Sequence, residues 1–189
     1  QVQHRVLERL ESSVEGADAV ICSDYAKGLL TDSILERSRA ARREHGVPAV
    51  IDPKMRTFER YHGFSFVTPN EKEFTQAYEV DIDDEERLRE VVCPDVAARR
   101  WEALVVTRGA KGVTIIGADS IDHIPGHPVE VFDVVGAGDT FIATLALSLA
   151  AELSPSESAA VANVAGSVVV NKVGTASTSV DEIRAHLPR

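Results

Sequence analysis

The sequence has 189 residues, of which 44% are hydrophobic and 26% are charged. This length allows one domain with a sizeable core and is too short for two ordinary ones, so we expect residues 1–189 to form a single unit. The 20 basic and 30 acidic residues give a net charge of −10, which argues against binding to nucleic acid or to an anionic membrane surface. No apolar run approaches the roughly 20 residues of a membrane-spanning helix.

The amino-terminal stretch and the cysteines indicate a cytoplasmic chain. The stretch QVQHRVLERLESSVEG lacks an initiator Met, and its charges exclude a secretory signal. It is typical of a helix entered midway, so we expect the numbering to begin inside a longer protein. Cys22 and Cys93 are isolated and show no CxxC or zinc-like spacing, which favours free thiols in a reducing compartment.

Short apolar runs rich in β-branched residues alternate with longer helical patterns along the chain. In chain order, we predict buried strands at 17–25, 47–53, 64–70 and 103–109, followed by a hairpin-like continuation through 112–117 and the DHIPG stretch. The predicted helices are 31–45, with Thr31 as its cap, then 71–79, 84–100, 137–152, 155–171 and 179–187. This alternation predicts βαβ units and a doubly wound, mostly parallel α/β sheet flanked by helices.

Polar or glycine-containing residues follow each predicted strand, where open α/β sheets usually carry their function. Asp24 and Lys27 lie in SDYAKG after the first strand, and Lys54 follows IDP after the second. A lysine at such a position is either an ordinary surface residue or well placed to pair with a phosphate.

Two further strand ends allow a local and a functional interpretation. In TPNEKE, Asn70 and Glu73 have the spacing of a capping box, but an amide and a carboxylate could also hold Mg²⁺, through waters because this ion dehydrates reluctantly. In TRGAKG, Thr107, Gly109 and Gly112 form either a plain hairpin turn or a glycine-lined floor for a nucleotide.

The stretch DVVGAGDTF (133–141) places a small-residue turn between Asp133 and Asp139, directly before an apolar helix. Backbone N–H groups at a helix start favour a phosphate or a phosphoryl group in transfer. Asp139 would repel a bound phosphate, but it makes sense as the base for a hydroxyl group that lies between the two. A glycine turn with a capping aspartate is the plain alternative, and short glycine motifs often occur by chance.

These features, in this order, resemble the ribokinase-like (PfkB) sugar kinases. DVVGAGDTF matches the carboxy-terminal signature of that family, and ANVAGSVVVNKVGT (162–175) resembles the helix and loop that close over the adenine. The resemblance implies a ribokinase-like fold that is incomplete at its amino terminus, with ATP and Mg²⁺ as cofactors and with K⁺ allowed. It assigns Asp139 as the base and Gly136, Ala137 and Gly138 as the anion hole. For the remaining sites it assigns the nucleotide to Asn70, Thr107, Gly109, Gly112, Asn163 and Lys54; Mg²⁺ to Asn70 and Glu73; and a monovalent cation to Asp133, Val135, Val169, Lys172 and Gly174.

Within this family, SDYAKG, IDPK and TPNEKEF look most like the heptose-7-phosphate kinases of lipopolysaccharide-precursor synthesis. The resemblance then implies phosphorylation of the anomeric hydroxyl of D-glycero-D-manno-heptose 7-phosphate, with Asp24 and Lys27 on the sugar side. It implies a small-molecule sugar phosphate as partner and allows a homodimer. Two alternatives stay open: a kinase for a ribose-like sugar or fructose phosphate, and a nucleotide-binding fragment without catalysis.

Overall fold

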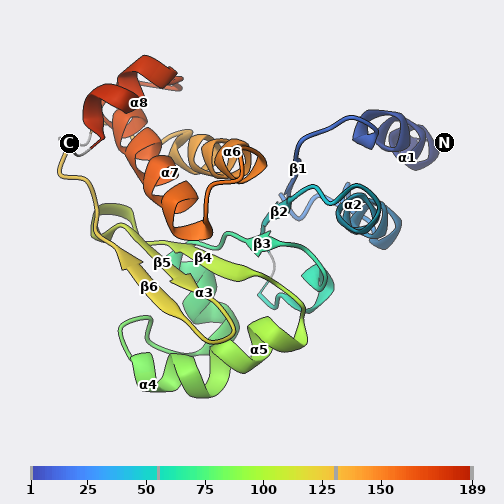
Figure 1. Ribbon diagram of the computed structural model, residues 1–189, viewed down its shortest axis with the longest axis horizontal. Helices are drawn as coiled ribbons and strands as arrows, with labels where there is room; N and C mark the ends of the chain where they lie inside the picture. The colour runs from blue at the N-terminus through green and yellow to red at the C-terminus, as the bar shows by residue number, and fades with distance from the viewer. Residues whose placement is uncertain (1, 55, 130–131, 188–189) are drawn as a thin grey trace.

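The computed structural model describes residues 2–54, 56–129 and 132–187. Figure 1 shows a mixed sheet with helices on both of its faces. The strands are β1 (Val20–Ser23), β2 (Ala49–Asp52), β3 (Phe66–Val67), β4 (Ala103–Thr107), β5 (Val113–Ile116) and β6 (Ile121–Ile124). The α-helices are α1 (Val2–Val14), α2 (Asp32–His45), α3 (Glu71–Tyr78), α4 (Glu85–Arg87), α5 (Cys93–Ala98), α6 (Ala137–Ala150), α7 (Pro155–Val170) and α8 (Val180–His186).

The described strands pair in the order β1-β2-β3-β4-β5-β6. β1 to β4 are parallel, and β4-β5 and β5-β6 are antiparallel, which confirms a mostly parallel sheet with a hairpin-like continuation. The strand order follows the chain without reversal over these residues, so the carboxyl ends of β1 to β4 meet at one edge. None of the helices in the described ranges is long and apolar enough to cross a membrane.

Two apolar layers hold the sheet because its inner strands, β2 to β5, are buried on both faces. Alternate residues of the strands point to opposite sides: Ile51 and Leu104 pack in the layer that contains residues of α2, α3 and α5. Val50 and Val105 pack with residues of α6 and α7 in the other. The parallel strands therefore have continuous apolar sequences, as is typical of a sheet covered by helices.

The predicted helices are present with small shifts at their ends, but the strands are shorter than predicted. β3 ends at Val67, and Pro69 soon after it has no N–H group for sheet pairing. The predicted helix 84–100 contains a π-helical turn, η2 (Leu88–Val92), between α4 and α5. In this turn Cys93 donates to the carbonyl of Leu88, and the next residue, Pro94, has no N–H group to continue the regular ladder.

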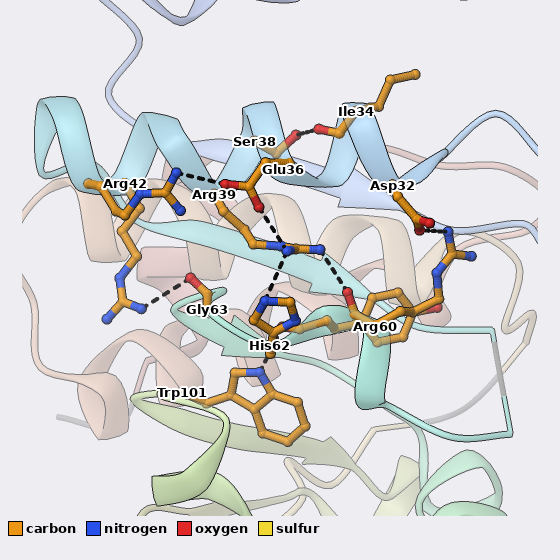
Figure 2. Close-up of polar contacts among 12 residues, drawn as sticks. Asp32, Ile34, Glu36, Ser38, Arg39, Arg42, Arg60, His62, Gly63 and Trp101 are labelled. Atoms are coloured by element: carbon orange, nitrogen blue, oxygen red, sulfur yellow. Dashed lines mark hydrogen bonds and ion pairs between the residues drawn. The ribbon is translucent and has the colours of Figure 1, made fainter.

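A network of arginines links α2 to the segment that follows β2 (Figure 2). The nearly buried Arg39 donates to Glu36, to His62 Nε2 and to the carbonyl oxygen of Arg60. Arg60 in turn donates to Asp32 at 3.2 Å. These bonds join α2 to η1 (Glu59–Tyr61), the short helical turn that contains Arg60 and ends at Tyr61.

Candidate active site

The carboxyl edge of the parallel strands carries a groove and an adjoining cavity. The groove runs past Asn70, Thr107 and Gly109. Thr107 and Gly109 also line a cavity of about 330 Å³. Several predicted residues contribute to its wall, namely Thr107, Gly109, Gly112, Ala137, Gly138 and Asn163. The fold thus brings together residues from β4, α6 and α7 that are far apart in the sequence.

The turn before α6 gives this cavity a helix amino terminus. Gly136 is the N-cap and has a left-handed backbone, with φ 81°, which glycine adopts without strain. The first amide groups of a helix have no carbonyl partner within it and carry the positive end of its dipole. Asp139 lies in this first turn and is exposed. The arrangement combines anion-stabilising N–H groups with a carboxylate beside them.

Asn70 and Glu73 form the capping box that their spacing predicts. Asn70 Oδ1 accepts from the Glu73 N–H at 2.9 Å, and Glu73 Oε2 accepts from the Asn70 N–H at 3.0 Å. The second carboxylate oxygen of Glu73 accepts a hydrogen bond from Lys54 Nζ at 2.8 Å. Lys54 Nζ also lies 3.8 Å from Asp52 Oδ1. Glu73 is therefore both a cap and one side of a charged cluster.

Asp52 is the member of this cluster that the sequence did not single out. Burial, with smaller contributions from the charges of Glu73 and Asp139, raises the pKa of Asp52 to about 6 against the attraction of Lys54. For Lys54, burial lowers the pKa, but the hydrogen bond to Glu73 and the charge of Asp52 outweigh it and raise the pKa. One ammonium thus lies between carboxylates from β2 and α3.

The two residues predicted on the sugar side have different surroundings. Asp24 is buried, and its carboxylate accepts from the Ala26 N–H at 2.8 Å and from the Tyr61 hydroxyl at 2.8 Å. Burial and this bond raise the pKa of Tyr61. Asp24 therefore stabilises the SDYAKG turn, whereas Lys27, in the same turn, is exposed.

Backbone proximity explains the glycine at position 112. A Cβ atom there would overlap the carbonyl oxygen of Ile124 and the amide of Gly126, and φ is +94°. On the facing helix, Asn163 Nδ2 donates to the Pro125 carbonyl at 2.9 Å. The Asn163 hydrogen bond and the close backbone approach at Gly112 hold the residues after β6 against the cavity. His127 and Ser167 also line this cavity.

Asp133 links the turn before α6 to the loop after α7. Its carboxylate accepts from the N–H groups of Val135 at 3.0 Å and Gly174 at 3.2 Å. The predicted cation-site loops are therefore adjacent, although Val169 O accepts from the Lys172 N–H and Lys172 Nζ pairs with Glu182 at 2.6 Å. Within the described residues, Thr178 Oγ1 is buried without a hydrogen-bond partner. This unassigned oxygen, in the loop that includes Gly174, suits a cation ligand.

The donor groups fit a magnesium ion that keeps part of its water shell. Among the described ranges, no three His, Cys, Asp or Glu side chains converge as a metal cage. Mg²⁺ is usually bound by one or two carboxylates together with waters and substrate phosphates. Glu73, one of the two residues predicted for Mg²⁺, and Asp52 are such a pair, bridged by Lys54. The side-chain oxygen of Asn70, the other predicted residue, accepts the cap hydrogen bond from the Glu73 N–H.

A model of the pfkB family carbohydrate kinases matches residues 2–182. The chain belongs to this family. It is 42% identical over 188 residues to the bifunctional protein HldE of Mesorhizobium japonicum, covering 97% of this chain and 37% of that protein. It is 41% identical over 181 residues to the bifunctional protein HldE of Azorhizobium caulinodans, covering 95% of this chain and 37% of that protein. The chain thus spans little more than a third of the length of these relatives.

Solved structures show the same fold. A ribokinase of Arabidopsis thaliana, complexed with ribose and ATP, superposes with a TM-score of 0.77 at 23% identity, covering 94% of this chain and 58% of that one. Phosphofructokinase-2 of Escherichia coli, in complex with potassium, also has a TM-score of 0.77, at 20% identity, covering 95% of this chain and 60% of that one. These similarities confirm the α/β, ribokinase-like fold predicted from the sequence.

Proposed function

We propose that this pfkB-family protein transfers the terminal phosphoryl group of ATP to a hydroxyl group of a sugar phosphate. The observation that carries the proposal is the position of Asp139, in the first turn of α6 and directly after Ala137 and Gly138, which line the cavity of about 330 Å³. We further propose that residues 1–189 act as one nucleotide-binding unit, since both apolar layers share one sheet.

Asp139 acts as the general base in this proposal. The acceptor hydroxyl gives its proton to the Asp139 carboxylate while its oxygen bonds to the γ-phosphorus. The bond from the γ-phosphorus to the bridging oxygen breaks, and ADP leaves with the electron pair. The N–H groups at the start of α6 stabilise the charge on the transferring group. When bound, Mg²⁺ held by Glu73 and Asp52 would neutralise charge on the phosphates.

The nucleotide would lie in the cavity, with its base toward Asn163 and its phosphates toward the start of α6. Thr107, Gly109 and Gly112 form the wall between these two ends. The Arabidopsis ribokinase with the same fold was solved with ATP and ribose, which supports ATP as the donor. The orphaned Thr178 hydroxyl and the Asp133 carboxylate support a monovalent cation beside α6, and phosphofructokinase-2 with this fold was solved with potassium.

We propose D-glycero-D-manno-heptose 7-phosphate as the acceptor, at its anomeric hydroxyl. The support is the resemblance of SDYAKG, IDPK and TPNEKEF to heptose-7-phosphate kinases and the identity of about 40% to HldE proteins. Lys27, exposed in the turn after β1, supplies a cation for the phosphate that the sugar already carries.

The test is phosphoryl transfer by the full-length protein with heptose 7-phosphate, fructose 6-phosphate and ribose. We expect heptose 7-phosphate to be preferred, and Asp139→Asn to lower kcat roughly 10²-fold or more while ATP affinity changes little. Near-normal turnover of the variant would refute Asp139 as the base. A preference for ribose would mean that the acceptor is an unphosphorylated sugar, as in ribokinases. ATP binding without transfer to any sugar would favour a nucleotide-binding module.

A further inference from the structure

The Lys54 ammonium lies where two carboxylates would otherwise repel each other. It donates to Glu73 Oε1 at 2.8 Å and lies 3.8 Å from Asp52 Oδ1. The Asp52 and Glu73 side chains are only 24% and 15% exposed. Because charges that are partly removed from water interact strongly, this pair needs a cation between its members.

We propose that Lys54 is an internal counter-ion that competes with the divalent cation for Asp52 and Glu73 and is displaced when the metal binds. Only the identity of that cation as Mg²⁺ rests on the proposed function. A metal ion that approached the pair would have to displace the ammonium, because two cations cannot share these oxygens at such distances. The site is therefore weak for a free divalent ion.

The released lysine has a new partner available only when an anion arrives with the metal. Lys54 is on a flexible four-carbon stem, and its side chain is 37% exposed, so it can leave Glu73 without disturbing the core. A phosphate group bound near the start of α6 would form an ion pair with the Lys54 ammonium. The exchange thereby favours metal that arrives together with phosphate over metal alone.

The capping box keeps Glu73 in place during this exchange. Glu73 Oε2 accepts from the Asn70 N–H at 3.0 Å, so only Oε1 changes its partner. Asp52 is held more weakly, since the Ser23 hydroxyl reaches its Oδ2 at 3.4 Å. The pair therefore offers one fixed and one adaptable carboxylate.

The experiment is titration of the full-length protein with Mn²⁺ in the absence of nucleotide, with free Mn²⁺ followed by electron paramagnetic resonance. Lys54→Met keeps the length of the side chain and removes its charge. We expect Lys54→Met to bind Mn²⁺ roughly 10- to 100-fold more tightly than the wild type, the range for one charge-assisted contact. Lys54→Arg should keep wild-type affinity. In the Lys54→Met background, Glu73→Gln should abolish the gain.

Lys72→Met is the matched control, because Lys72 precedes Glu73 in α3 and has no ion pair within the described residues. It should change Mn²⁺ affinity by no more than about twofold, since exposed charges are largely screened. An equal gain in Lys72→Met would mean a general charge effect and overturn the proposal, as would unchanged or weaker binding by Lys54→Met.

Thermal unfolding with and without Mn²⁺ provides a second measurement, since at one ligand concentration a ligand of the folded state stabilises it more the more tightly it binds. The stabilisation by Mn²⁺ should be larger in Lys54→Met than in the wild type, and an equal rise would contradict the competition. Neither measurement needs phosphoryl transfer. If the kinase assay showed no phosphoryl transfer, the Mn²⁺ result for Lys54 would still hold. If Lys54→Met did not bind Mn²⁺ more tightly, the proposed kinase activity would be unaffected.

Discussion

Asp52→Asn should stabilise the folded protein at neutral pH although it alters the candidate active site. Burial, together with the charges of Glu73 and Asp139, raises the pKa of Asp52 from 3.8 to about 6. Between these values the folded state binds more protons than the unfolded state, so stability decreases as the pH rises. Above pH 6 the ionised carboxylate of the wild type therefore reduces the free energy of unfolding.

The size of the effect follows from the shift. A difference of 6 − 3.8 = 2.2 pKa units, at about 1.36 kcal/mol per unit, corresponds to about 3 kcal/mol. The side chain is 24% exposed, and solvent screening lowers the expected gain to about 2 kcal/mol. An asparagine has nearly the shape of the protonated acid, so the gain should be present above pH 6 and disappear toward pH 4.

The assay is urea unfolding of the wild type and Asp52→Asn at several pH values between 4 and 8. Trp101 is the single tryptophan of the sequence and is buried, with its Nε1 donating to the Tyr61 carbonyl, so its fluorescence reports loss of the core. Asp18→Asn, at an exposed carboxylate before β1, controls for the same chemical change outside the site. A less stable Asp52→Asn at pH 7.5, or a gain that does not shrink toward pH 4, would refute the reasoning.

Two other predictions concern the cavity wall and the cation loop. Gly112→Ala should destabilise the protein by roughly 3 kcal/mol, because its Cβ would overlap the Ile124 carbonyl in a backbone conformation open only to glycine. Gly109→Ala, with φ +55° and open space around its Cβ, should cost only about 1 kcal/mol in the same urea experiment, and equal losses would contradict the overlap argument. In the kinase assay at matched ionic strength, K⁺ should support faster transfer than Na⁺, and Asp133→Asn should remove that difference. Equal rates of the wild type in both salts would refute the cation site without affecting the assignment of Asp139.

The family and most helix positions could be predicted from the sequence because they depend on short-range patterns. The Asn70–Glu73 spacing defines a capping box whatever lies around it, and this box forms as predicted. Thr31 and Pro155 mark helix starts by their positions, as the N-cap of α2 and the first residue of α7, although the Thr31 side chain makes no cap hydrogen bond. DVVGAGDTF could be recognised because one contiguous stretch contains the turn, the helix start and the carboxylate.

Only the tertiary structure showed which side chains of the site are buried and which charged groups lie close together. Asp52 occurs in an ordinary IDP stretch, and its pKa is raised chiefly by burial in the folded chain, with smaller contributions from the charges of Glu73 on α3 and Asp139 on α6. Lys54 could be read as a surface lysine until the parallel order of β2, β3 and β4 placed it beside Glu73. The burial of the Thr178 hydroxyl and of the Asp24 carboxylate likewise depends on the folded surroundings, which the sequence around these residues does not encode. The physical reason is that hydrogen bonds within a turn depend on neighbouring residues, whereas desolvation and charge coupling depend on which strands lie side by side.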